Sequence, residues 1–230
     1  MAKVNASAPT DSARKKQLLE LAYAHVLEHG LAGMSLRPLA EAVGSSPRVL
    51  LFLFGSKDAL VQALLGRARE DELRMLDALH RTPRQYGPAQ AGGLVWDWLA
   101  DPGHRPLLTL WAEAYTCSLV DRSGPWAGFA RRTVDDWLQV FAAAQEPAVR
   151  DTPEGLAERT LLLSVLRGAL LDLLATDDHP RTTAAVTSHL RTLAAAAPDR
   201  SGEGQSHHET GSPGRGPQRD VAAGGAGQPA

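Results

Sequence analysis

Residues 36–57 carry two short helical patterns joined by a turn that begins with glycine. Ser35 stands at the N-cap of the first pattern, and Gly44 stands where a left-handed residue favours the end of a helix. Ser46 and Pro47 supply the second pattern with a cap and with a proline at its first helical position. This order of caps, turn residues and helical patterns is typical of a helix-turn-helix, in which the second helix lies in the major groove of DNA.

The run from Val49 to Phe54 is entirely apolar, and periodicity alone would also allow it as a buried strand. The cap in front of it and the Gly55-Ser56 pair behind it favour a helix of about one and a half turns. Leu50 and Phe54 lie four residues apart, so the helix directs both toward the inside.

The segment from about Arg14 to Leu65 resembles the N-terminal domain of the TetR family of transcriptional repressors. The resemblance is carried by matching residues at consistent spacing: Leu27-Glu28-His29-Gly30, Met34-Ser35-Leu36, Leu39-Ala40, Gly44, Ser46, Leu50, Phe54, Ser56-Lys57 and Leu60. It implies an all-α fold, with a three-helix N-terminal helix-turn-helix domain and a C-terminal ligand-binding and dimerisation domain of about six helices. It also implies a homodimer that binds double-stranded operator DNA and releases it when a small-molecule effector enters the C-terminal domain.

The same resemblance implies which side chains face DNA. They are Ser35, Arg37, Ser45, Ser46, Pro47, Arg48, Leu51, Phe52 and Lys57. Arg48 is expected to read bases and Lys57 to contact a phosphate.

Leu51 and Leu53 depart from the family pattern, because most relatives carry a tyrosine at the first position and often a histidine at the second. The tyrosine usually donates to a phosphate, which leucine cannot do. Phosphate contacts position a protein and base contacts specify the sequence, so this loss should weaken binding without changing sequence preference. Leu51 or Phe52 can instead touch a thymine methyl group or pack against neighbouring helices. A helix-turn-helix protein with weakened or lost DNA binding is therefore the alternative.

Charge and cysteine content narrow the class of protein. The 230-residue chain has a formal net charge of -2, so it is not a polycation. Residues 1–60 hold seven Lys/Arg against five Asp/Glu, so their net charge is +2 and that of the remainder is -4. This asymmetry is expected when the N-terminal domain binds DNA. A single cysteine, Cys117, excludes an intrachain disulfide framework and fits a reducing compartment. With no apolar leader and no membrane-length apolar run, we expect a cytoplasmic protein without a membrane partner.

The order of patterns along the chain predicts four parts. Residues 1–11 form a flexible arm, 12–57 the helix-turn-helix domain, 58–197 the ligand-binding and dimerisation domain, and 198–230 a disordered tail too poor in apolar residues to fold. Breakers at Pro, Gly and Asp residues divide the third part into helices. The predicted helices run from residue 58 to about 80 and over 90–100, 106–121, 126–144, 153–176 and 180–197.

All five tryptophans lie in the C-terminal part of the chain. The resemblance places an effector pocket among its middle helices and implies an apolar or aromatic ligand held by Trp111, Tyr115, Phe129, Trp137 and Arg167. Aromatic residues at helical spacing also fit a plain hydrophobic core. Arg167 interrupts a leucine-rich helix, where it either binds an anionic ligand group or pairs with an acid such as Asp135, Asp136 or Glu113, the ion pair being preferred.

The two last predicted helices suit a dimer interface. The helix over 153–176 carries leucines nearly all round, which is typical of a helix buried on more than one side. Two helices from each subunit would form a four-helix interface, which is also where the family dimerises, and would supply the two-fold symmetry of a palindromic operator. The predicted interface residues are Leu163, Leu166, Leu170, Leu174, Val186, Leu190 and Leu193. A core helix inside one subunit is the alternative.

His25, Glu28 and His29 form an H-x-x-E-H pattern, the inverted zinc-peptidase motif. A catalytic zinc normally has a third protein ligand, and no downstream cluster offers one. The segment also ends at Gly30, where the first helix of the repressor-like domain ends. A zinc-dependent hydrolase is therefore a remote alternative, and we predict no catalytic residue, metal or cofactor.

Overall fold

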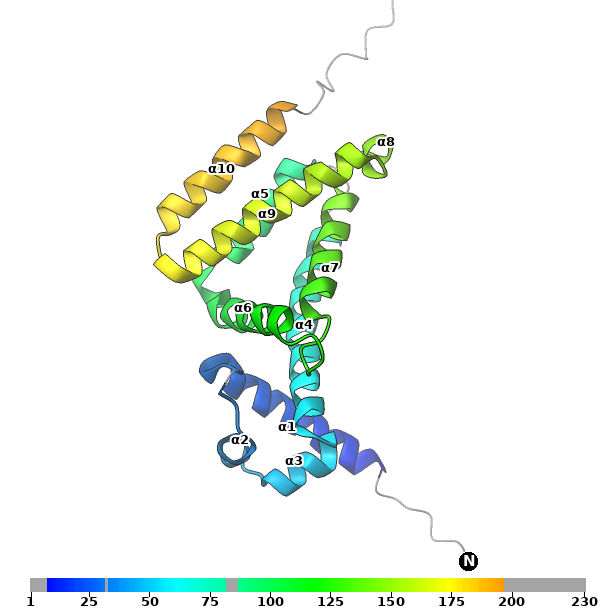
Figure 1. The fold of residues 1–230 in the computed structure, drawn as a ribbon, viewed down its shortest axis with the longest axis vertical. Helices are drawn as coiled ribbons and strands as arrows, with labels where there is room; N and C mark the ends of the chain where they lie inside the picture. The colour runs from blue at the N-terminus through cyan, green and yellow to red at the C-terminus, as the bar shows by residue number, and fades with distance from the viewer. Residues whose placement is uncertain (1–7, 32, 82–86, 197–230) are drawn as a thin grey trace, which may run out of the picture. The chain divides into compact units, whose positions relative to one another are not determined.

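The computed structural model describes residues 8–31, 33–81 and 87–196. Every regular element in these ranges is helical, as predicted (Figure 1). The elements are α1 (Ala8–His29), α2 (Leu36–Ala42), α3 (Pro47–Phe54), α4 (Lys57–Arg81), α5 (Pro88–Leu99), the 3₁₀ turn η1 (Pro102–His104), α6 (Arg105–Val120), α7 (Phe129–Ala143), α8 (Pro147–Arg150), α9 (Pro153–Thr176) and α10 (His179–Ala196). The predicted arm is partly wrong, because residues 8–11 belong to α1. Residues 1–7 and the predicted tail lie outside the described ranges.

The turn between α2 and α3 has the predicted local chemistry. Gly44 has a φ of 62°, the left-handed region that glycine tolerates best. Its N–H donates to Glu41 O at 3.1 Å, and Ser45 N–H donates to Ala40 O at 2.8 Å, the hydrogen-bond pattern of a Schellman motif. Ser46 Oγ then accepts the N–H of Val49 at 3.3 Å and caps α3. These bonds fix the angle at which α3 leaves α2.

The boundaries differ from prediction around α7 and α8. Asp121 Oδ1 accepts the backbone N–H groups of Ser123 and Gly124, both at 3.0 Å, and holds a turn after α6. Trp126, expected inside a helix, therefore lies in the turn region, and α7 begins only after Gly128, which has a φ of 72°. The four-residue helix α8, also missed, is too short to leave a periodic signal.

Two hydrophobic clusters make up the interior. The first joins α1–α3 to the N-terminal half of α4 and to α6; Leu18, Val26 and Leu50 in it are completely buried. The second lies among α5, α6, α7, α9 and α10 around the fully buried Phe141 and Leu162. Helix α4 runs from α1–α3 toward α6 and α7, and so links the two regions (Figure 1).

Within the described ranges, no single helix is long and apolar enough to cross a membrane. By length and composition alone, α3 taken together with Lys57–Arg74 passes as one bent pair, with 71° between the two helices.

Candidate DNA-binding surface and effector pocket

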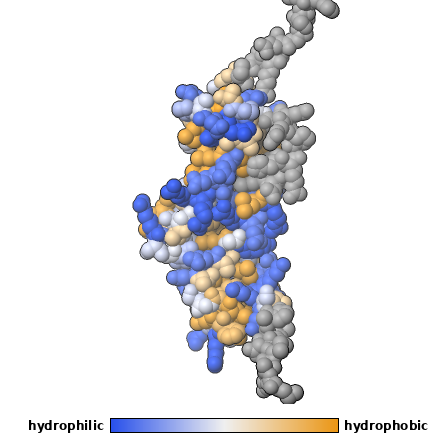
Figure 2. Space-filling model, turned by 90° about the vertical axis from the view of Figure 1, so that its right-hand side faces the viewer, coloured by the Kyte–Doolittle hydropathy of each residue, from blue (hydrophilic) through white to orange (hydrophobic). Residues whose placement is uncertain are grey.

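Helix α3 has a buried side and an apolar exposed side. Leu50 and Phe54 are 0% and 7% exposed, so the predicted inward pair is confirmed. Phe52 is 74% exposed, and Val49 and Leu51 are each 39% exposed. Figure 2 shows apolar surface at the end of the molecule where Figure 1 places α1–α3. Exposed apolar residues on this scale are typical of a surface that binds something.

Exposed cationic and hydroxyl side chains lie on α2, on α3 and at the start of α4. Arg37, Arg48 and Lys57 are exposed, and in the described part of the chain none of them forms an ion pair. Ser35 occupies the N-cap of α2, yet its hydroxyl makes no capping hydrogen bond. Its side chain is therefore available to an outside acceptor, as an interface with phosphate requires.

The remaining predicted DNA-facing residues are less exposed or already form a hydrogen bond. Ser45 and Pro47 are half-buried at the start of α3. Ser46 is exposed, but its oxygen already accepts the Val49 N–H, so toward DNA the hydroxyl would act as a donor.

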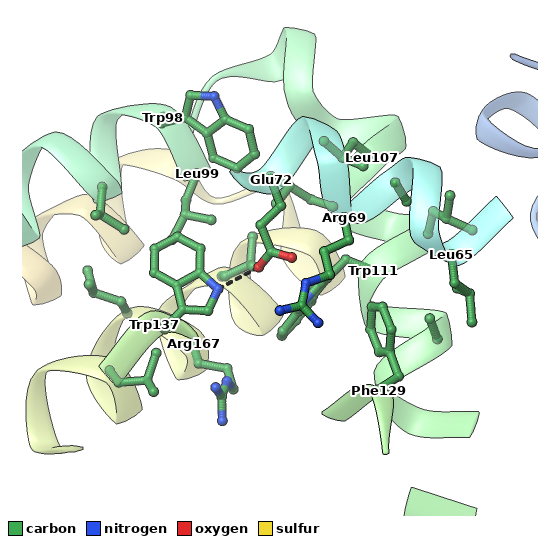
Figure 3. A pocket seen from close by; sticks show the side chains of 18 residues that line it. Leu65, Arg69, Glu72, Trp98, Leu99, Leu107, Trp111, Phe129, Trp137 and Arg167 are labelled. Carbon is green, nitrogen blue, oxygen red and sulfur yellow. Dashed lines mark hydrogen bonds between the residues drawn. The ribbon is translucent and has the colours of Figure 1, made fainter. Parts of the chain in front are cut away.

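A cavity of about 650 Å³, counted out to its open mouth, lies among α4, α5, α6, α7 and α9. Most of its wall is aliphatic or aromatic, and Arg69, Glu72 and Arg167 supply the charged groups (Figure 3). The lining residues are Leu65, Ala68, Arg69, Glu72, Val95, Trp98, Leu99, Leu107, Leu108, Leu110, Trp111, Ala114, Phe129, Trp137, Leu163, Leu166, Arg167 and Leu170. Apolar walls with a few polar groups are typical of small-molecule sites.

Glu72 is a nearly buried acid in this cavity, 7% exposed. Its Oε1 accepts the indole N–H of Trp137 at 2.6 Å (Figure 3). Burial raises the pKa of Glu72 to about 7; the Trp137 hydrogen bond and the cations Arg69 and Arg167 oppose the rise, and Asp136 adds to it. The carboxyl group is therefore close to half protonated near neutral pH.

The two arginines of the cavity have different partners. Arg69 pairs with Asp136, with Nη2 and Oδ2 2.6 Å apart. Arg167 donates from Nη1 to the hydroxyl of Tyr115 at 3.0 Å, and its guanidinium lies 4.9 Å from the centre of the Tyr115 ring and 6.0 Å from that of Trp111. The ion pair preferred for Arg167 is therefore wrong: Asp136 is taken by Arg69, and an aromatic pair holds Arg167.

Four of the five predicted ligand residues line the cavity, namely Trp111, Phe129, Trp137 and Arg167. Tyr115 stands behind them, against Trp111 with ring centres 5.0 Å apart. The sequence analysis missed Glu72, Arg69 and Trp98. Glu72 falls on the same helical stripe as Leu65 and Ala68, so an acid on an apolar stripe was the available signal.

The predicted interface leucines are mostly internal. Leu163, Leu166 and Leu170 line the cavity, and Val186 is completely buried within the single chain, so these four side chains face away from any second subunit. Leu174, Leu190 and Leu193 are partly buried against the same core. The outward stripe of α9 consists instead of Ala157, Leu161, Ser164, Gly168, Leu171 and Ala175.

Charged side chains connect α1 to α4. The hydroxyl of Tyr23 donates to Asp71 Oδ2 at 2.7 Å. Arg67 pairs with Asp71 at 2.7 Å and with Glu20 at 2.8 Å. A further bond, from Leu31 N–H to Glu113 Oε2 at 2.8 Å, connects α6 to the end of α1. The cavity helices α4 and α6 therefore both contact the helix-turn-helix region.

His25 and His29 stack on one face of α1, with ring centres 4.1 Å apart. Among the residues that the structure describes, no group of three or more His, Cys, Asp or Glu side chains is arranged to hold a metal ion. The residues of the H-x-x-E-H pattern thus lie on one helix, α1, at or near its surface.

The N-terminal helices match a known family model. Residues 18–64 match the model described as bacterial regulatory proteins, tetR family. No curated protein matches the chain significantly.

Solved structures share the fold over most of the chain. A transcriptional regulator from Rhodococcus sp. Rha1 is 20% identical, with a TM-score of 0.63 over 77% of this chain and 94% of that one. A TetR transcription regulator from Haloarcula marismortui is 17% identical, with a TM-score of 0.61 over 79% and 98%. The multidrug binding protein EbrR, in complex with imidazole, is 23% identical, with a TM-score of 0.57 over 77% and 89%. EbrR structures with proflavin and ethidium also match. Residues 18–64 therefore match the tetR family of bacterial regulatory proteins, and the chain has the fold of these TetR-type structures.

Proposed function

We propose that this protein is a cytoplasmic transcriptional repressor, and not an enzyme, that binds a palindromic operator as a homodimer and leaves it when a small apolar or aromatic effector binds. The observation that carries the proposal is the outer surface of α3, where exposed apolar residues lie beside cations that have no acidic partner in the described part of the chain. Unpaired cations beside a helix that fits the major groove are suited to duplex DNA.

The residues on this surface have distinct roles in the proposal. Arg48, near the N-terminal end of α3, reads a base edge, since arginine is the side chain that most often contacts guanine. Leu51 and Phe52 contact thymine methyl groups. Ser35, at the start of α2, and Lys57, at the start of α4, contact phosphates, which positions the protein without reading sequence.

The second copy is proposed to pack on the exposed side of α9 and α10. The stripe of α9 that begins at Ala157 and ends at Ala175 follows a four-three spacing of small and apolar residues. The hydroxyl of Ser164 on this stripe is already satisfied by Thr160 O at 2.8 Å. Such a surface can be covered by a second helix without leaving a polar group unpaired.

The effector is proposed to occupy the cavity and to act through α4. The EbrR structures with proflavin and ethidium support a cavity of this fold as a site for flat aromatic molecules. On α4, Ala68 and Glu72 line the cavity, whereas Arg67 and Asp71 contact α1. A ligand that prefers one position of α4 therefore also favours one position of the helix-turn-helix.

Selection of fragments from the encoding organism's genome on the purified protein, at near-physiological salt, tests the proposal. We expect enrichment of a site with two-fold symmetry, and loss of that enrichment for Arg48→Ala. Arg122→Ala, which removes an exposed arginine far from α3 in the chain, is the matched control and should enrich the same site. Absence of any DNA binding by the wild-type protein would overturn the proposal.

A regulator with weakened DNA binding is a second candidate, favoured by the leucine at position 51, where most relatives have a tyrosine. It predicts that little or no DNA is retained in the selection, because leucine cannot supply the phosphate contact of that tyrosine. The same selection separates the two candidates.

A further inference from the structure

Glu72 is the acidic side chain that lines the cavity (Figure 3). Its carboxyl group lies between the indole of Trp137 and the side chain of Arg69 in this view. Trp137 supplies a hydrogen bond to Oε1, and within the described residues Oε2 has no donor. The Glu72 side chain is only 7% exposed, and an ionised carboxylate in such a place is costly unless another group pairs with it, so this oxygen has the capacity to accept a hydrogen bond or to face a cation.

The cations near Glu72 are already engaged by other groups. Arg69 forms its ion pair with Asp136, and Arg167 is held by the hydroxyl and ring of Tyr115 and by the ring of Trp111. Neither makes a hydrogen bond or ion pair with Glu72 in the structure. The acid is thus free to neutralise a charge that a ligand brings with it.

We propose that the effector is a flat aromatic cation, with a protonated or quaternary nitrogen that the carboxylate of Glu72 neutralises between aromatic walls. This inference rests on the proposed function, because it names the class of effector. The face of an aromatic ring attracts a cation and also packs against apolar groups. Trp98, Trp111 and Trp137 therefore suit an aromatic cation better than aliphatic side chains would.

Binding of such a cation exchanges it for a proton. Without ligand, the raised pKa of Glu72, about 7, keeps the group largely protonated in mildly acidic solution. The charged groups facing it are Arg69 on its own helix, Asp136 on α7 and Arg167 on α9; α5 and α6 present apolar side chains to the cavity. His104, whose ring stacks on that of Trp98 at 4.3 Å, is a titratable group behind the wall and does not line the cavity. The cation favours the ionised carboxylate, so its affinity increases with pH.

An anionic ligand is the competing class, because Arg167 Nη2 is buried and has no hydrogen-bond partner. An anion at Arg167 would require Glu72 to stay protonated, so its affinity would fall as pH rises. The direction of the pH dependence therefore separates the two classes.

The test is ethidium binding to the full-length protein without DNA, measured by fluorescence between pH 5.5 and 8.5. Ethidium keeps its positive charge throughout this range, so the protein alone titrates. We expect its affinity to rise about 30-fold over the range and to level off above pH 7, as a group with a pKa of about 7 requires. Glu72→Gln should bind at least about 10-fold more weakly than wild type at pH 8 and show a flat profile.

Two further variants separate binding from folding. Glu70→Gln removes an exposed acid on the same helix and should reproduce the wild-type profile. Trp137→Phe removes a hydrogen bond that favours ionised Glu72, so it should move the midpoint of the profile to higher pH. This shift tests the role of Glu72 even if Glu72→Gln fails to fold.

The outcomes also distinguish this inference from the proposed function. Absence of ethidium binding, or equal affinity for wild type and Glu72→Gln, overturns the cationic class. If anilinonaphthalene sulfonate or a neutral polycyclic aromatic then binds and releases the selected operator, the effector response stands and only its chemical class was wrong. If none of these probes binds the folded protein or releases operator, the effector response itself is overturned.

Discussion

The hydroxyl of Tyr23 on α1 donates to Asp71 Oδ2 on α4 across 2.7 Å. Although burial opposes it, hydrogen bonds from Arg67 and Tyr23 hold the pKa of Asp71 below its ordinary value, so the acceptor is charged at neutral pH. A neighbour on α4, Glu72, belongs to the cavity. One turn of helix therefore contacts both the DNA-binding helices and the proposed effector.

Tyr23→Phe should destabilise the protein and weaken this connection. A hydrogen bond to a charged group contributes roughly 1.5–3 kcal/mol, and Phe leaves a buried site with one fewer donor to Asp71. We expect the free energy of unfolding in urea to fall by about 2 kcal/mol. Equal stability of Tyr23→Phe and wild type would contradict a strong bond.

Glu72 should make the unliganded protein less stable as pH rises. Its folded pKa is about 7 against an ordinary value of 4.5, so the folded state binds more protons than the unfolded state between these values. The contribution is full below pH 4.5 and is lost as pH passes 7, with a total of up to about 3 kcal/mol.

Chemical denaturation of wild type and Glu72→Gln at pH 5 and pH 8 measures this effect. The wild type should lose stability relative to the variant at the higher pH. A difference between the two proteins that does not change with pH would show that Glu72 keeps its ordinary pKa in the fold.

Local chemistry explains why most helices could be predicted from the sequence. The Ser46-Pro47 start of α3 and the glycine at 44 act through hydrogen bonds to near neighbours, and α9 begins and ends at the predicted residues because Thr152 caps it and Asp177 ends it. The start of α7 depends on a contact from a residue distant in the chain, and α8 is too short to leave a periodic signal. The hydroxyl of Ser118 on α6 accepts the N–H of Ala130 at the start of α7.

The site residues were harder to predict than the helices, because the sequence does not show which side of a helix packs against which neighbouring helix. Trp111, Phe129 and Trp137 could be assigned to the cavity only because the family resemblance places an effector pocket among the middle helices; their spacing alone fits a plain hydrophobic core equally well. Leu163 and its neighbours on α9 were assigned to the dimer interface, since a helix apolar all round gives no sign of which stripe faces the core. The role of Glu72 could not be predicted from the sequence, because it depends on which side chains of other helices contact its carboxyl group. Trp137 donates a hydrogen bond to it, and neither Arg69 nor Arg167 does.

Arg48→Ala and Lys57→Ala should weaken operator binding in different ways. Loss of a base contact at Arg48 should cost about 1–3 kcal/mol on the operator and relax preference at one base pair. Loss of a phosphate contact at Lys57 should weaken binding to all sequences alike and reduce the salt slope by about one. Titrations on the operator and on a scrambled duplex at several salt concentrations measure both. Equal losses on every sequence for Arg48→Ala would contradict its base-reading role.

Replacing Gly155 or Gly66 by alanine should change the free energy of unfolding in opposite directions. A Cβ at Gly155, in the first turn of α9, would lie 2.1 Å from the backbone oxygen of Val149, so α8 would have to move. Gly66 on α4 has open space around the same position, and alanine there gains helix propensity. We expect Gly155→Ala to cost about 1–3 kcal/mol and Gly66→Ala to gain about 0.5–1 kcal/mol in thermal or urea unfolding. Stabilisation by both would mean that α8 is not held against α9.

Leu171→Glu should separate the proposed dimer without unfolding the subunit. Leu171 is 48% exposed on the outward stripe of α9, so a charge there is tolerated by a single chain but would be buried by a second copy. Leu94→Glu changes a leucine of similar exposure, 39%, on α5 and is the matched control. Sedimentation should find a monomer for Leu171→Glu and a dimer for wild type and Leu94→Glu. Operator affinity should fall with the dimer, because each half-site would then be bound singly; a dimer that survives Leu171→Glu would place the interface elsewhere.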